Sequence, residues 1–195
     1  MKVLLHTCCG PCASACVPRL VSEGHEVTMF YSNSNIDTSE EFERRRAAAE
    51  RLAAADGVEL VADGYDHEAW LEEAARGFEG EPEKGARCER CFRFNLARTA
   101  RYAAEHGYDA FATSLTVSPH KVSSVIFAQG DAALSSQPQL PNSPTSQPPN
   151  FPTSQLHFLH CDFKKRDGFK LSVKRAAELG LYRQSYCGCE FSKRA

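Results

Sequence analysis

Seven of the nine cysteines in this 195-residue chain lie in three short groups that are far apart in the sequence. The groups are Cys8, Cys9 and Cys12; Cys88 and Cys91; and Cys187 and Cys189. Clustered thiolates bind iron or zinc, and neighbouring thiols form reducible disulfides. A lone buried cysteine usually behaves as a small hydrophobic residue, which does not account for such spacings. The sequence therefore predicts metal or redox chemistry.

Each group has a spacing with its own chemical meaning. The Cys8-Cys9 loop leads into a predicted helix, whose positive end lowers the pKa of nearby thiols. Cys88 and Cys91 are three residues apart at the start of another helix, so both can reach one metal. Cys187-Gly-Cys189 is too cramped for two ordinary tetrahedral ligands, and it suits a reducible disulfide or a second iron. Zinc is the alternative metal, although only Cys88 and Cys91 have zinc-knuckle spacing.

The other two cysteines have no partner nearby in the sequence. Cys16 lies one turn after Cys12, and Cys161 lies in a predicted strand, so we expect both to be core residues. Among the histidines, His120 is the one we expect close to the thiols.

The bulk properties restrict the class of protein. A length of 195 residues suits one domain, and a net charge of −2 gives no overall nucleic-acid signature. The apolar runs are too short to span a bilayer and the amino terminus does not resemble a signal peptide, so we expect no membrane association. Without an export signal we expect a reducing, cytoplasmic location, and the odd cysteine count argues against a simple disulfide framework.

Short apolar runs alternate with amphipathic stretches, which is typical of a parallel sheet covered by helices. We expect strands at residues 2–6, 26–31, 58–62, 108–113 and 157–163. Predicted helices lie between them, one opened by a capping box of Thr38 and Glu41 and one by Ser118-Pro119. The predicted fold class is a single α/β domain, 1–195, with an open, mainly parallel five-stranded Rossmann-like sheet and helices on both faces. A Pro/Ser/Gln-rich insertion at about 135–156 and a cysteine-bearing tail at 181–195 complete the chain.

Polar or thiol residues follow every predicted strand. They are the loop 7–12, the run 32–35, Asp63, Ser114 and Asp162. In an open parallel sheet, ligands bind at the carboxyl ends of the strands. We therefore expect a metal pocket at that edge.

Several motifs together resemble one known family. They are HTCCGPC at 6–12, YSNSNI at 31–36, EEFERR at 40–45, RCERCF at 87–92, TSLTVSPHK at 113–121, DFKKRDGF at 162–169 and GLYRQSYCGCEFS at 180–192. This combination, in this order, resembles the cobalamin-independent epoxyqueuosine reductases, the QueH family.

The resemblance implies reduction of epoxyqueuosine to queuosine at the wobble position of a tRNA anticodon, the last step of queuosine biosynthesis. It implies a [4Fe–4S] cluster on Cys8, Cys9, Cys88 and Cys91, leaves an additional mononuclear iron open, and implies no cobalamin. Cys187 and Cys189 would be the redox-active pair or hold the second iron. Cys12 is either a further ligand or a supporting thiol, and Asp162 is a candidate oxygen ligand or proton donor. The candidate substrate-binding residues in or beside the motifs are Asn33, Asn35, Arg45, Ser114, Tyr182 and Arg183.

The expected partners are the modified tRNA and an external electron donor; the oligomeric state stays open. Two other functions compete with this interpretation. One is an ATP-dependent tRNA thiolation enzyme, which is disfavoured because the loop after the first strand has too few glycines to bind a pyrophosphate. The other is a zinc-stabilised RNA-binding module without catalysis.

Overall fold

The computed structural model describes residues 1–136 and 156–193. Its five strands form one all-parallel sheet in the order β3-β2-β1-β4-β5. The strands are β1 (Lys2–His6), β2 (Glu26–Tyr31), β3 (Glu59–Ala62), β4 (Ala110–Thr113) and β5 (His157–Phe158). The predicted α/β class with a parallel five-stranded sheet is confirmed.

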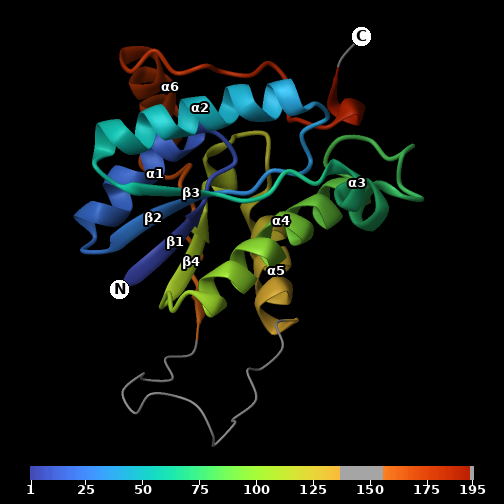
Figure 1. Ribbon diagram of the computed structural model, residues 1–195, viewed down its shortest axis with the longest axis horizontal. Coiled ribbons are helices and arrows are strands. Elements are labelled where there is room, and N and C mark those ends of the chain that lie inside the picture. The colour runs from blue at the N-terminus through green and yellow to red at the C-terminus, as the bar shows by residue number, and fades with distance from the viewer. Residues whose placement is uncertain (137–155, 194–195) are drawn as a thin grey trace, which may run out of the picture.

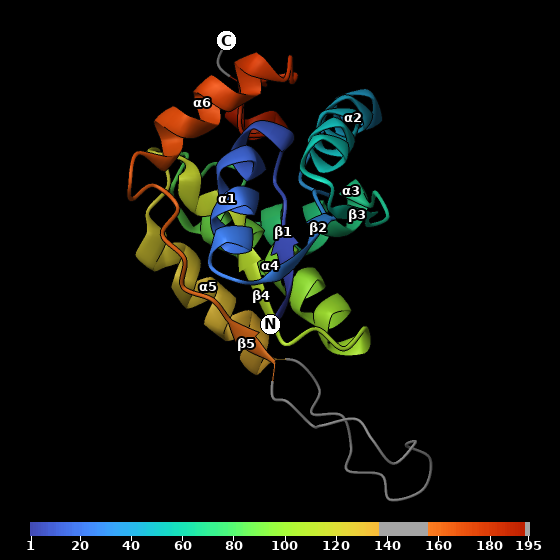
Figure 2. The same ribbon diagram turned by 90° about the vertical axis from the view of Figure 1, so that its left-hand side faces the viewer.

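Helices cover both faces of the sheet. They are α1 (Gly10–Ser22), α2 (Ser39–Asp56), α3 (His67–Trp70), α4 (Ala86–Glu105), α5 (Ser123–Ser135) and α6 (Gly168–Glu178). The helices α1, α2 and α6 lie on one face, whereas α4 and α5 lie on the other (Figures 1 and 2). Three short turns complete the list, a π-helical turn at Leu71–Ala75 and 3₁₀ turns at Ser114–Val117 and Glu190–Ser192.

The central strand and the second helix form for reasons that are visible in the sequence. Val3, Leu4 and Leu5 are fully buried, as expected for a strand covered on both faces. The Thr38 hydroxyl accepts a hydrogen bond from the Glu41 backbone N–H at 3.2 Å, so Thr38 caps α2 as predicted.

Helix α1 packs unusually close to α2. A Cβ atom on Gly10 would lie 2.6 Å from the carbonyl oxygen of Ala48, so only glycine permits this approach. The close contact fixes the start of α1, which has Cys9 as its N-cap and contains Cys12.

Two predicted boundaries are wrong. Ser118 does not cap a helix; its hydroxyl accepts from the His120 N–H at 3.3 Å within a turn, and α5 begins only at Ser123. The strand predicted at 157–163 ends at Phe158, because its pairing with β4 ends at Phe111. Asp162 therefore lies in the loop beyond β5 rather than at a strand end.

Two further expectations concern the Pro/Ser/Gln-rich insertion and membrane association. Residues 137–155 of the Pro/Ser/Gln-rich insertion lie outside the described residues. Within the described ranges, none of the helices has the length and hydropathy that crossing a membrane requires.

Candidate metal and redox site

The carboxyl edge of the sheet is held together by hydrogen bonds between strand ends. The buried His6 ring lies between the Thr113 hydroxyl, at 2.9 Å, and the Ser32 carbonyl, at 3.1 Å. The Ser32 hydroxyl donates to the Asp63 carboxylate at 2.7 Å, and Arg98 of α4 reaches the same carboxylate at 2.6 Å. The carboxyl ends of β1, β2, β3 and β4 are thus fixed relative to one another, so side chains at this edge of the sheet can be held in place.

The first thiol group lies at this edge of the sheet. Cys8, Cys9 and Cys12 bring their three sulfur atoms within 4.8 Å of one another, close enough to share a metal ion. Cys9 is the N-cap of α1, and its sulfur accepts a hydrogen bond from the Cys12 N–H at 3.4 Å. The Ser114 hydroxyl at the end of β4 donates to the Cys8 sulfur at 3.3 Å. The structure thus places at the carboxyl ends of the strands, as predicted, a thiol group that could hold a metal ion.

The pKa values of Cys9 and Cys12 are shifted in opposite directions. Hydrogen bonds from Cys12 and Cys8 lower the pKa of Cys9 well below its ordinary value. Hydrogen bonding to Cys8 and Cys9, together with burial, raises the pKa of Cys12 well above its ordinary value. The N-terminus of α1 also favours negative charge at its cap. Cys9 is therefore the residue best placed to be the first thiolate.

The second thiol group begins α4. The Cys88 sulfur accepts a hydrogen bond from the Lys84 N–H at 3.2 Å, and the Cys91 sulfur accepts one from the Asn95 amide at 3.7 Å. Burial raises the pKa of the Cys91 thiol well above its usual value, and negative charge on Cys187 raises it further. Neither cysteine belongs to the compact group formed by Cys8, Cys9 and Cys12.

The third thiol group lies in the carboxyl-terminal tail. Cys187 is exposed, whereas Cys189 is buried against Trp70, Phe94 and the partly buried Cys91. The fold thus brings the second and third groups together, although almost one hundred residues separate them in the sequence.

Lys121 lies among the thiols and was not predicted from the sequence. Burial lowers the pKa of this lysine, but negative charge on Cys187, Cys8 and Cys12 outweighs burial and raises it above its usual value. In the motif TSLTVSPHK the sequence pointed to the neighbouring His120 instead, and the structure leaves His120 exposed in a turn. Asn95 was also missed, although its position one helical turn after Cys91 is a usable signal.

Most of the predicted substrate-binding residues have partners within the protein. The Asn33 amide donates to the Thr7 carbonyl at 2.8 Å, Asn35 accepts from Asn95 at 3.1 Å, and Ser114 bonds Cys8.

The remaining three candidates differ in how far their side chains are exposed to solvent. Arg45 is 2% exposed and bonds the tail, while the Tyr182 hydroxyl donates to the Glu41 carboxylate at 3.0 Å. Arg183 is exposed, with its guanidinium 5.5 Å from the centre of the Phe169 ring. Of this set, Arg183 is the residue most accessible to a large ligand.

Asp162 and the two remaining cysteines lie outside the thiol groups. An Asp162 carboxylate oxygen accepts from the Ser123 hydroxyl at 3.0 Å and from the Lys164 N–H at 3.3 Å, which ties it to the start of α5. Cys16 is fully buried in the core between α1 and the sheet, and Cys161 packs against that core.

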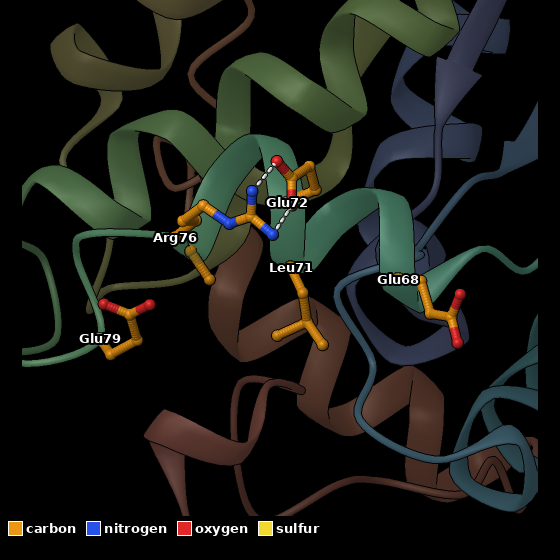
Figure 3. Close-up of a pocket in the computed structure, with 6 residues that line it drawn as sticks. Glu68, Leu71, Glu72, Arg76 and Glu79 are labelled. Atoms are coloured by element: carbon orange, nitrogen blue, oxygen red, sulfur yellow. Dashed lines mark hydrogen bonds and ion pairs between the residues drawn. The ribbon is translucent and has the colours of Figure 1, made fainter.

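Two hollows lie away from the thiols. One, of about 400 Å³, adjoins α3 and is lined by Glu68, Glu72 and Glu79, with Arg76 paired to Glu72 (Figure 3). Its acidic rim repels phosphate. The other is a groove of about 550 Å³ between α1 and α6, lined by several cations including Lys165, Arg166 and Lys174.

Two features of the site suit a metal group held by sulfur ligands. Thiolates are the donors that iron–sulfur clusters use. In addition, the buried indole N–H of Trp70 donates toward the Cys91 sulfur and lowers the pKa of that thiol against the effect of burial, and it has no other partner among the described residues. Hydrogen bonds to sulfur are a known means of tuning such clusters.

The fold and the site define a class: α/β proteins that gather cysteine thiols at the carboxyl edge of a parallel sheet. Residues 3–195 match the family model described as epoxyqueuosine reductase QueH, and the chain belongs to this family of oxidoreductases. The resemblance noted from the motifs is confirmed.

Relatives from distant bacteria agree with this assignment. The epoxyqueuosine reductase QueH of Streptococcus pyogenes serotype M1 is 32% identical over 197 residues, covering 98% of this chain and 70% of the relative. The protein of the same name from Acinetobacter baylyi is 32% identical, with 99% and 81% covered. The one from Dehalococcoides mccartyi is 31% identical, with 98% and 92% covered.

Proposed function

We propose that this chain reduces epoxyqueuosine to queuosine in the tRNA anticodon. The observation that carries the proposal is the coincidence of a family match over residues 3–195 with three thiols within 4.8 Å of one another at the strand ends. The family name states the reaction for the relatives, and the thiol pocket gives this chain the means for redox chemistry.

The proposed cofactor is an iron–sulfur cluster held by Cys8, Cys9, Cys88 and Cys91, with Cys12 as an additional thiol at the same place. When bound, such a group would carry low-potential electrons from the external donor toward the tail thiols, which themselves provide the two electrons of the epoxide reduction. The protein's own part is to hold the thiolates, with Ser114 and the start of α1 on one side and Asn95 on the other. These contacts support the assignment because outer partners of this kind orient ligands and tune their basicity.

The proposed redox pair is Cys187 and Cys189. Removal of the epoxide oxygen as water, leaving a carbon–carbon double bond, consumes two electrons and two protons. Oxidation of two thiols to one disulfide releases two electrons and two protons, so the tail dithiol balances the reaction. An external electron donor would then reduce the disulfide for the next turnover. The exposure of Cys187 beside buried Cys189 supports a role at the substrate-facing end of this pair.

Positive charge for the RNA would come from local groups, since the net charge of the chain is −2. Exposed Arg183 and the cation-lined groove between α1 and α6 support this part of the proposal. Phosphate contacts by Lys and Arg dominate such affinities.

The decisive experiment is anaerobic purification followed by iron and sulfide analysis and an assay on epoxyqueuosine-containing RNA. We expect a brown protein that forms queuosine, and we expect Cys187→Ser to retain the cluster spectrum but lose turnover. Loss of the cluster in Cys187→Ser would instead make Cys187 a ligand and refute the division of roles. A colourless zinc protein without activity would favour the RNA-binding module.

A further inference from the structure

We propose that Arg45 is a positioning residue that sets the location of the Cys187-Gly188-Cys189 segment, an inference that rests on the proposed redox role of that segment. The sequence placed Arg45 among substrate-binding candidates. Its contacts point to a different task.

The Arg45 guanidinium lies between α2 and the tail, almost wholly buried. Its Nε donates to the Glu41 carboxylate at 2.7 Å, one turn earlier in α2. One terminal nitrogen donates to the Cys187 carbonyl at 2.9 Å, and the other donates to the Tyr186 carbonyl at 3.4 Å. The same guanidinium lies 4.9 Å from the centre of the Tyr186 ring. One planar group therefore bonds two consecutive peptides of the tail.

Arginine suits this task because its donors point in fixed directions within one plane. Glu41 anchors one edge of that plane, and the same carboxylate also accepts from the Tyr182 hydroxyl at 3.0 Å. Glu41 and Arg45 thus hold the tail at Tyr182 and again at Tyr186–Cys187. A lysine carries its three donors on a single nitrogen, so it could not reach Glu41 and both tail carbonyls at the same time.

A second contact area fixes the next residue. The Asp37 N–H donates to the Gly188 carbonyl at 3.0 Å, and its carboxylate accepts from the Tyr186 hydroxyl at 2.7 Å. Gly188 has φ +147°, and a Cβ there would lie 2.8 Å from the Asn35 amide nitrogen. The backbone between the two cysteines is therefore seated tightly against the loop that follows β2.

These contacts matter because the tail has little structure of its own. Its regular structure among the described residues is one 3₁₀ turn, Glu190–Ser192, which follows the cysteines. The direction of the Cys187 side chain is thus determined by contacts with α2 and the β2 loop, while Cys189 is also held by its packing against Trp70 and Phe94. Because Cys189 packs beside Cys91, a small shift of the tail would separate the redox pair from the second thiol group.

The test compares Arg45→Met and Arg45→Lys with Arg46→Met in the anaerobically purified holoenzyme. Arg46 is adjacent in α2 but pairs with Glu43 at the surface, so it is a matched control. Amide hydrogen exchange is measured by peptide, together with kcat, KM and iron content. For Arg45→Met we expect exchange in residues 182–193 to rise at least about tenfold, because local opening free energy sets exchange protection.

The kinetic pattern separates positioning from general destabilisation. We expect kcat of Arg45→Met to fall at least about tenfold while KM changes less than about twofold, since misplacing a reacting group lowers the rate rather than binding. Iron content should stay at the wild-type level, and Arg45→Lys should recover part of kcat. Faster exchange throughout the chain, or unchanged tail exchange with unchanged kcat, would overturn the proposal.

A milder variant keeps the test decisive if Arg45→Met does not fold. Tyr186→Phe removes the hydrogen bond to Asp37 and leaves the Arg45–Glu41 pair intact, so we expect a smaller rise in exchange confined to the same peptide. If Arg45→Met does not fold, wild-type-like tail exchange together with wild-type kcat in Arg45→Lys would overturn the proposal. If the wild-type enzyme forms no queuosine, the proposed function fails, whereas the exchange data still decide whether Arg45 holds the tail.

Discussion

The first and third thiol groups are built in opposite ways. Cys8, Cys9 and Cys12 lie where a buried strand meets a helix, so backbone hydrogen bonds of β1 and α1 fix them. Cys187 and Cys189 lie on a tail fixed mainly by side chains such as Arg45. Side-chain contacts open at a lower cost than a central strand. The first group is therefore held more rigidly than the third, whose contacts can open at a lower cost.

The largest effect should come from breaking the rigid group. Cys9→Ser keeps an oxygen that can cap α1 but removes the best-placed thiolate, so we expect loss of bound iron and a fall in turnover of more than about 100-fold. Iron analysis and the queuosine assay measure both effects. Cys16→Ala, on the same helix but in the core, is the control and should retain iron. Full iron content in Cys9→Ser would remove Cys9 from the ligand set.

The next largest effect should come from moving the tail without touching a thiol. Gly188→Ala places a Cβ 2.8 Å from the Asn35 amide in a backbone region that alanine avoids, so the tail must shift. We expect kcat to fall about 10- to 100-fold with iron retained, because misplacement of about 1 Å has effects of this size. Gly64→Ala is the matched control, since a Cβ there meets no atom within 4 Å. Loss of iron in Gly188→Ala would show that the two regions are not independent.

This contrast also explains what the sequence could and could not predict. The strands follow from apolar runs, α2 follows from its capping box, and the location of Cys8 and Cys9 follows from the end of β1. The docking of the tail depends on Arg45, which is 142 residues from Cys187, and on nothing local to either motif. Lys121 was missed because the turn at Ser118 replaces the predicted helix start. Local sequence signals therefore predicted the position of the first thiol group but not the contacts that hold the third.

The Asp63–Arg98 ion pair lies at the carboxyl edge of the sheet, where the first thiol group is located. Burial raises the pKa of Asp63, but hydrogen bonds from Arg98 and Ser32 outweigh burial and lower it below its usual value. A lowered carboxyl pKa stabilises the fold above the unfolded-state value of about 3.9, and this contribution is lost as the pH falls through the folded-state pKa. Arg98→Met should therefore reduce the free energy of unfolding by about 1–2 kcal/mol at pH 7.

The pH dependence gives this prediction its control. Urea unfolding of wild type and Arg98→Met should converge as the pH falls below about 4, where Asp63 becomes protonated in the variant first. Arg101→Met, at an exposed position of the same helix, should match wild type at both pH values. An equal deficit at both pH values would mean that Arg98 acts through packing and not through Asp63.

The smallest effect should come from the exposed face of the tail. Arg183 differs from Arg45 in being exposed, so its charge is available to an RNA phosphate while Arg45 is engaged by the protein. We expect Arg183→Gln to weaken RNA binding a few-fold and to reduce the slope of log affinity against log salt by roughly 0.7–0.9, as for one phosphate contact. Amide exchange in residues 182–193 should not change, because the buried contacts of Arg45 and Asp37 remain.

Arg76→Gln, beside Glu72 at the acidic hollow, is the charge-matched control. An unchanged salt slope in Arg183→Gln would place the RNA elsewhere, and faster tail exchange would show that even the exposed side of the tail helps to hold its cysteines.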